Sequence, residues 1–136
     1  MRLALLSAIM ALQSMTLFAQ GPMPVCQGDL TVVRVSQIKP AGSIQGFMAA
    51  VAAHQAWYRT HGFTDNQIVA SRVIVLDQST GASVYSDKEV LTYHFRPPGM
   101  GNPAGRGDAA WNAYVKLYQD NSTIKSEYVT CMPRSR

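Results

Sequence analysis

One short segment of the chain carries side chains that could do chemistry on a small molecule. The segment from 89 to 96 (EVLTYHFR) alternates three polar residues, Thr92, His94 and Arg96, with three apolar residues, Leu91, Tyr93 and Phe95. In a strand, this alternation places the two sets on opposite faces of the sheet. We expect the apolar set to face the core and the helices. His94 would then lie on the other face of the sheet, where an imidazole can act as an acid, a base or a ligand.

Two arginines on other predicted strands can join His94 on that face. By the same alternation, Arg34 and Arg72 are expected beside Arg96. Three guanidinium groups around a histidine could hold an anion or an enolate, with His94 as the catalytic residue. A second interpretation is that these residues form hydrogen bonds and ion pairs in an interface, with Glu127 as a partner. The sequence leaves both interpretations open.

His54 is a further candidate ligand-binding residue, and it lies in the apolar stripe of a predicted helix. A histidine in such a stripe is usually a core residue with satisfied hydrogen bonds, so a ligand-binding role is the less common alternative. His54 and His61 are seven residues apart, which is about 10 Å along a helix and too far to share one metal ion. We therefore expect no metal site on this helix.

Cys26 and Cys131 lie near the two ends of the chain and are its only cysteines. In an oxidising compartment two cysteines usually pair, and neither has the close C-x-x-C spacing of a redox or metal site. On the chain-entropy model, closing a loop of about 105 residues stabilises a fold by roughly 4 to 5 kcal/mol. The sequence therefore predicts a structural disulfide.

The elements that must position these residues follow from the pattern of apolar residues and breakers. Ser43 is expected to be the N-cap of a helix over 44–61, and Gly62 the residue that stops this helix. Asp108 is expected to be the N-cap of a second helix over 109–119. Strands are predicted over 30–38, 67–76, 89–96 and 122–130. This order is the split βαβ pattern of a ferredoxin-like α+β domain, with a four-stranded antiparallel sheet and two helices on one face. In that topology the first and last strands are neighbours, which brings the two cysteines together.

The first 19 residues have the layout of a secretory signal peptide. A positive start precedes an apolar run from 3 to 12, and the stretch ends in a small residue, Ala19. The run is shorter than the roughly 20 residues that span a bilayer, so we expect no stable membrane anchor. Residues 20–28 then form a flexible lead-in, 29–132 a single domain and 133–136 a tail. The predicted location is secreted or periplasmic.

The net charge of +4 is spread along the chain. Because the basic residues occur mostly singly and do not cluster on one element, we expect no nucleic-acid partner.

The end of the first predicted helix carries a family resemblance. Residues 54–62 (HQAWYRTHG), followed directly by a second strand, resemble the dimeric α/β-barrel superfamily, which includes antibiotic-biosynthesis-monooxygenase-like, EthD-like and NIPSNAP-like domains. The resemblance spans about residues 29 to 132. It implies a homodimer in which two sheets enclose a cavity, and activities in this group range from cofactor-independent oxygenation to haem degradation. Some haem-handling relatives use a helix histidine as the iron ligand, a role that would fall to His54.

The sequence supports two functions of different classes. The first is an exported binding or accessory protein without a cofactor that holds a small anionic or aromatic ligand in a cavity on the sheet face. The second is a cofactor-independent monooxygenase-like enzyme that uses His94 with the arginines. Fold alone does not choose between them.

Overall fold

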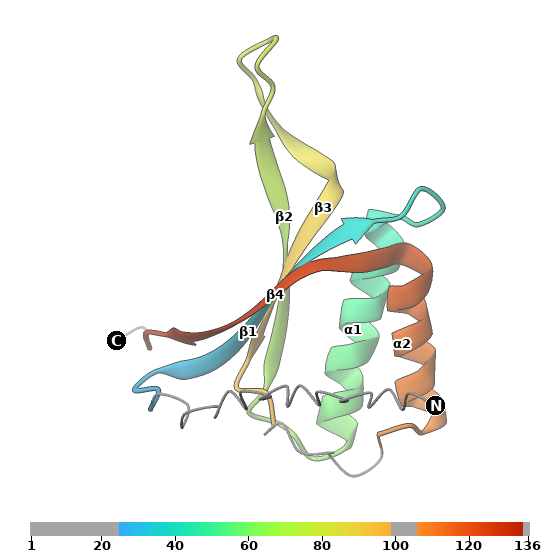
Figure 1. The fold of residues 1–136 in the computed structure, drawn as a ribbon. Coiled ribbons are helices and arrows are strands. Elements are labelled where there is room, and N and C mark those ends of the chain that lie inside the picture. The colour runs from blue at the N-terminus through green and yellow to red at the C-terminus, as the bar shows by residue number, and fades with distance from the viewer. Residues whose placement is uncertain (1–24, 99–105, 135–136) are drawn as a thin grey trace, which may run out of the picture.

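The chain folds in the order that the sequence predicts. The computed structural model describes residues 25–98 and 106–134, so the predicted signal peptide and most of the lead-in lie outside the described residues. The elements are β1 (Asp29–Ile38), α1 (Ile44–Thr60), β2 (Gln67–Leu76), β3 (Ser83–Phe95), α2 (Ala109–Asn121) and β4 (Ser122–Met132). The strands form one antiparallel sheet in the order β2-β3-β1-β4. Both helices pack together on one face of this sheet (Figure 1). The prediction of a ferredoxin-like α+β fold is therefore confirmed.

Both helices begin at the predicted N-caps. The Ser43 hydroxyl accepts a hydrogen bond from the Gly46 amide at 2.9 Å, and the Asp108 carboxylate accepts one from the Trp111 amide at 2.6 Å. Each cap satisfies a backbone N–H that has no partner within its helix. Gly62 follows α1 with a φ of +82°, the left-handed conformation that ends many helices. Neither helix in the described part of the chain is long and apolar enough to cross a membrane.

The start of α1 is locked to the end of α2 by Asn121. Its side-chain oxygen accepts a hydrogen bond from the Ser43 amide at 2.9 Å, and its carbonyl oxygen accepts one from the Lys39 amide at 2.9 Å. The two segments approach so closely that a Cβ on Gly42 would lie 2.3 Å from the Asn121 carbonyl oxygen. Glycine is therefore required at position 42 for steric reasons.

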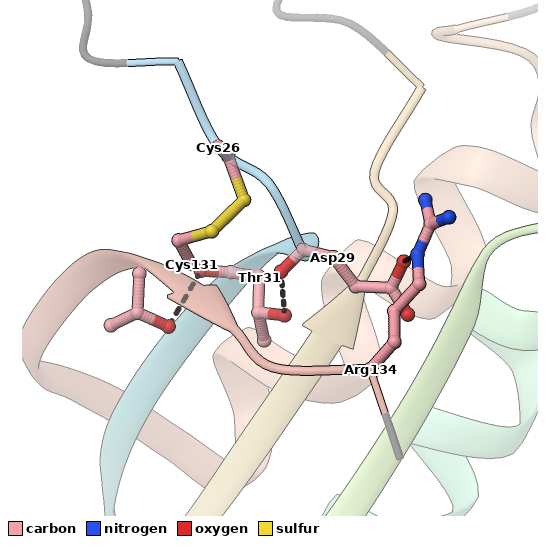
Figure 2. The surroundings of a disulfide bond; sticks show 6 residues. Cys26, Asp29, Thr31, Cys131 and Arg134 are labelled. Atoms are coloured by element: carbon pink, nitrogen blue, oxygen red, sulfur yellow. Dashed lines mark hydrogen bonds and ion pairs between the residues drawn. A yellow bond between two sulfur atoms is a disulfide. The ribbon is translucent and has the colours of Figure 1, made fainter. Parts of the chain in front are cut away.

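The two cysteines form the predicted disulfide. Cys26 precedes β1 and Cys131 lies near the end of β4, and their Cα atoms are 5.5 Å apart (Figure 2). The pairing of β1 with β4 places Leu30 opposite Cys131, so the topology brings the two sulfurs together. Asp29 adds ion pairs to Arg96 and to Arg134 at the same corner.

The hydrophobic core lies between the helices and the β2–β3 half of the sheet. Its buried members come from both helices and from two strands: Phe47, Val51, Trp57, Tyr58, Ile68, Val90 and Tyr114. The candidate site lies beside this core, and all four strands contribute side chains to it.

Candidate functional site

His94 and Thr92 face the helices, and the prediction that they face away from them was wrong. Val90, Thr92 and His94 are buried on the helix-covered side, whereas Leu91, Tyr93 and Phe95 are half-buried and lie on the other face. Alternation along a strand fixes only that two sets of residues point in opposite directions. Which set is covered depends on where the helices pack.

Polar side chains also reach this covered side from β1. The register pairs Arg34 with Thr92 and Ser36 with Val90, so both β1 residues share the helix-covered face. A cavity of about 370 Å³ lies between this part of the sheet and the two helices. Its lining combines polar and apolar groups from all six elements and includes Arg34, Ser36, Phe47, His54, His94 and Tyr118. This cavity lies within one chain on the helix-covered face of the sheet, and it is distinct from the cavity between two sheets that the family resemblance implied.

The two cavity histidines are held by specific neighbours. The Asn66 side-chain amide nitrogen lies 2.9 Å from Nε2 of His94. Because the amide nitrogen can only donate, Nε2 accepts and the His94 proton lies on Nδ1. His54 Nδ1 lies 3.4 Å from the Tyr118 hydroxyl, and the ring centroids of the two histidines are 5.6 Å apart.

Both histidines are neutral at physiological pH. Burial is the main cause that lowers the pKa of His54 to about 3, and the charges of His94, Arg34 and Arg106 lower it further. Burial, followed by the charge of Arg34, lowers the pKa of His94 to about 4. Burial raises the pKa of Tyr118, so this hydroxyl keeps its proton. His54, His94 and Tyr118 therefore offer neutral donors and acceptors beside the charged Arg34.

The three predicted arginines do not converge. Arg34 lines the cavity and forms an ion pair with Glu127, the partner that the sequence indicated. Arg72 is exposed on β2, where it donates to the Ser86 carbonyl at 3.2 Å and lies over the Tyr85 ring.

Arg96 is also engaged away from the cavity. It donates to Asp29 at 2.8 Å and to the Asp65 carbonyl at 2.7 Å at the end of the sheet. The continuous basic face that the sequence suggested is therefore absent, and Arg34 is the one predicted arginine that lines the cavity.

The surroundings of His54 do not fit haem. Five aromatic or imidazole rings surround it with centroids 4.4 to 6.4 Å from its own: Tyr58, His94, Trp111, Tyr114 and Tyr118. A porphyrin needs a flat open space beside its histidine ligand, and these rings occupy that space. Within residues 25–98 and 106–134, no group of three or more His, Cys, Asp or Glu side chains could hold a metal ion.

Sequence reasoning missed two residues of the site. Asn66 is buried at the start of β2 and binds both His94 and Gln55. Nothing in its sequence context distinguishes it from a turn residue. Tyr118 lies on α2, and the spacing of apolar residues along a helix indicates which side chains are buried but not what a hydroxyl group contacts.

Comparison with known proteins adds no assignment. No family model and no curated protein matches the chain. Two solved structures resemble it weakly. A phage SAM lyase in complex with S-methyl-5'-thioadenosine has 16% identity and a TM-score of 0.27 over 82% of this chain and 96% of that one. A phage SAM lyase in the apo state has 14% identity and a TM-score of 0.28 over 85% of this chain and 99% of that one.

Proposed function

We propose that this protein is an exported binding or accessory protein that holds a small aromatic ligand with one polar group. The observation that carries the proposal is the cavity of about 370 Å³ with His54, His94 and Arg34 in its wall. This volume is at the lower end of the range for small-molecule sites, which combine apolar walls with a few placed polar groups. The disulfide supports an oxidising compartment.

The chemistry of the lining narrows the class of ligand. Phe47, Ile68 and Val115 supply apolar wall, and the two neutral imidazoles supply hydrogen bonds without charge. Arg34 is positive but already paired with Glu127. A ligand with one carboxylate or hydroxyl group on an aromatic body matches this arrangement, because it needs one polar contact and buries the rest of its surface. A polyanion would leave most of its charge without a partner.

Binding can be tested with a pair of probes that differ in charge. The protein is titrated with 2-naphthoate and with 2-naphthol while amide chemical shifts are recorded by NMR. We expect saturable shifts at cavity residues for at least one probe. Arg34→Gln should weaken 2-naphthoate more than 2-naphthol, because only the carboxylate gains from the guanidinium group.

A cavity-filling variant separates this site from surface binding. Val115 lines the cavity from α2, so Val115→Phe should reduce the affinity at least tenfold by occupying the space. Val25→Phe is the control, because Val25 is 92% exposed and lies outside the cavity lining. Equal binding by both variants, or shifts confined to residues outside the cavity, would contradict the proposal.

The monooxygenase-like alternative rests on the neutral imidazole of His94 in the cavity wall. A general base is most effective when its pKa is near the working pH, and a pKa of about 4 makes His94 a weak base. Binding is therefore the better supported function. Oxygen uptake with 2-naphthol that is lost in His94→Ala would favour the enzyme instead.

A further inference from the structure

The β2–β3 hairpin extends beyond the rest of the sheet as a two-stranded arm. β1 pairs with β3 only from Glu89 to Phe95, whereas β2 continues to pair with β3 as far as Leu76 and Ser83. Among the described residues, no third strand and no helix packs on the segments 73–76 and 83–88, and the hairpin projects from the molecule (Figure 1). We refer to residues 73–88 as the arm. The sequence predicted the β2 side of the arm within the strand over 67–76, but it began the next strand at Glu89, whereas β3 begins at Ser83.

The arm carries large apolar side chains on both of its faces. Ile74 is paired with Tyr85 and Val75 with Val84, so the two pairs point in opposite directions. Together with Leu76, these side chains are 42 to 63% exposed. An isolated two-stranded hairpin is only marginally stable in water, and exposed apolar patches mark interaction sites. The arm therefore has the surface of an element that is covered by a partner.

The tip of the arm is polar, and its base contains an irregularity in the strand pairing. Asp77 accepts hydrogen bonds from the Ser79 amide at 2.9 Å and the Ser79 hydroxyl at 2.6 Å. These bonds lower the pKa of Asp77, so the tip is anionic. At the base, the register shifts between Arg72 and Ile74, an irregularity that changes the direction of a hairpin. A charged tip beyond an apolar stem is suited to crossing a protein surface and ending in water, and it opposes insertion into lipid.

The same chain offers a matching surface on the outer face of its sheet. The register places apolar side chains there from all four strands: Val33, Val35, Val69, Leu91, Tyr93, Phe95 and Tyr128. Both helices lie on the opposite face (Figure 1), and no described element covers this one. We refer to these seven residues as the outer face.

We propose that the arm of one copy of this chain packs on the outer face of a second copy. The area is adequate for a stable complex. On one face of the arm, the apolar side chains of Ile74, Leu76 and Tyr85 are 60 to 63% exposed, and together they present roughly 300 Å². Two arms exchanged between two copies, each meeting an equal area on the outer face, bury about 1,200 Å², which is the lower limit of the standard size of a specific interface.

The first experiment is the mass of the oxidised full chain in solution, measured by light scattering across a range of concentrations. We expect an oligomer, and we expect Ile74→Ser to raise its dissociation constant at least tenfold. Ile124→Ser is the matched control: Ile124 on β4 is 60% exposed and Ile74 is 61% exposed, but Ile124 lies outside the arm and the outer face. Circular dichroism checks that both variants keep the fold.

Cross-linking then locates the contact. A photoreactive amino acid replaces Leu76 in chains labelled with ¹⁵N, and these are mixed with unlabelled wild-type chains. The expected product joins the labelled arm to an unlabelled peptide that contains Val33 or Tyr93. A monomer at all concentrations, an oligomer insensitive to Ile74→Ser, or cross-links from arm to arm would overturn the proposal. A monomer that binds phosphatidylglycerol vesicles through the arm would overturn it in favour of a membrane surface.

Discussion

Acidification to pH 4.5 should remove much of the stability of this protein before the hydrogen-bonded carboxylates of Asp77 and Asp108 become protonated. The cause is the pair of buried neutral histidines, His54 and His94, which are only 8% and 6% exposed. Burial holds the pKa of His54 at about 3 and that of His94 at about 4, below the ordinary value of 6.5. Below pH 6.5 the unfolded chain therefore binds more protons than the folded chain. The stabilising effect is complete above pH 6.5 and is lost as the pH falls toward 4 and then 3.

The size of the effect follows from these pKa values. Each histidine changes the free energy of unfolding by about 1.4 kcal/mol per pH unit while only its unfolded form titrates. Between pH 7 and pH 4.5, His54 and His94 together should remove roughly 5 kcal/mol. That is comparable with the whole stability of a small domain, about 5 to 15 kcal/mol. Hydrogen bonds lower the pKa values of Asp77 and Asp108, so these two carboxylates lose their contributions to the free energy of unfolding only below pH 4.5.

The assay is urea unfolding at half-unit steps from pH 7 to pH 4.5 with the disulfide intact, for the wild type and two variants. His94→Gln keeps an acceptor for Asn66 and removes one titrating group, so it should lose only about half as much stability over this range. Thr92→Val is the control, because it changes a buried neighbour on the same face that does not titrate. Thr92→Val should change the free energy of unfolding by the same amount at every pH, so that its dependence on pH stays that of the wild type.

Two results would contradict this expectation. The first is a wild type that keeps its free energy of unfolding to within about 1 kcal/mol between pH 7 and pH 4.5, which would mean that the histidines are hydrated or already charged in the fold. The second is a His94→Gln variant with the same pH dependence as the wild type. The acid sensitivity would then come from other groups.

Three further substitutions test the construction of the fold by urea unfolding at pH 7. Replacing Cys26 and Cys131 with serine should lower the free energy of unfolding by about 4 to 5 kcal/mol, since a loop of 105 residues is released; an unchanged midpoint would contradict the chain-entropy argument. Gly42→Ala should cost about 1 to 3 kcal/mol, because the new Cβ would lie 2.3 Å from the Asn121 carbonyl oxygen; a neutral result would mean that this contact can open freely. Ser43→Ala should lower the free energy of unfolding by about 1 kcal/mol through loss of the N-cap, whereas Ser43→Asp should keep most of the stabilisation that the N-cap provides. Equal losses in both variants would show that capping is not the cause.

Local signals in the sequence predicted the elements well. Ser43, Asp108 and Gly62 mark helix ends through the hydrogen-bonding and conformational preferences of single residues, and the structure uses all three. The candidate site was harder to predict. His54, His94 and Arg34 do line one cavity, but the sequence separated His54 from His94 by placing them on opposite sides of the sheet.

The order of the elements, and with it the neighbouring positions of Cys26 and Cys131, could be derived from the amino-acid sequence alone. Capping, turn formation and strand alternation depend on residues close in the chain, and the order of six elements leaves few antiparallel topologies. The face of the sheet that the helices cover could not be derived in this way. That choice depends on packing between distant segments, and here it brings polar His94 and Thr92 under the helices while Leu91, Tyr93 and Phe95 form the outer face. The cavity, the neutral state of its histidines and the apolar outer face all follow from that one packing choice.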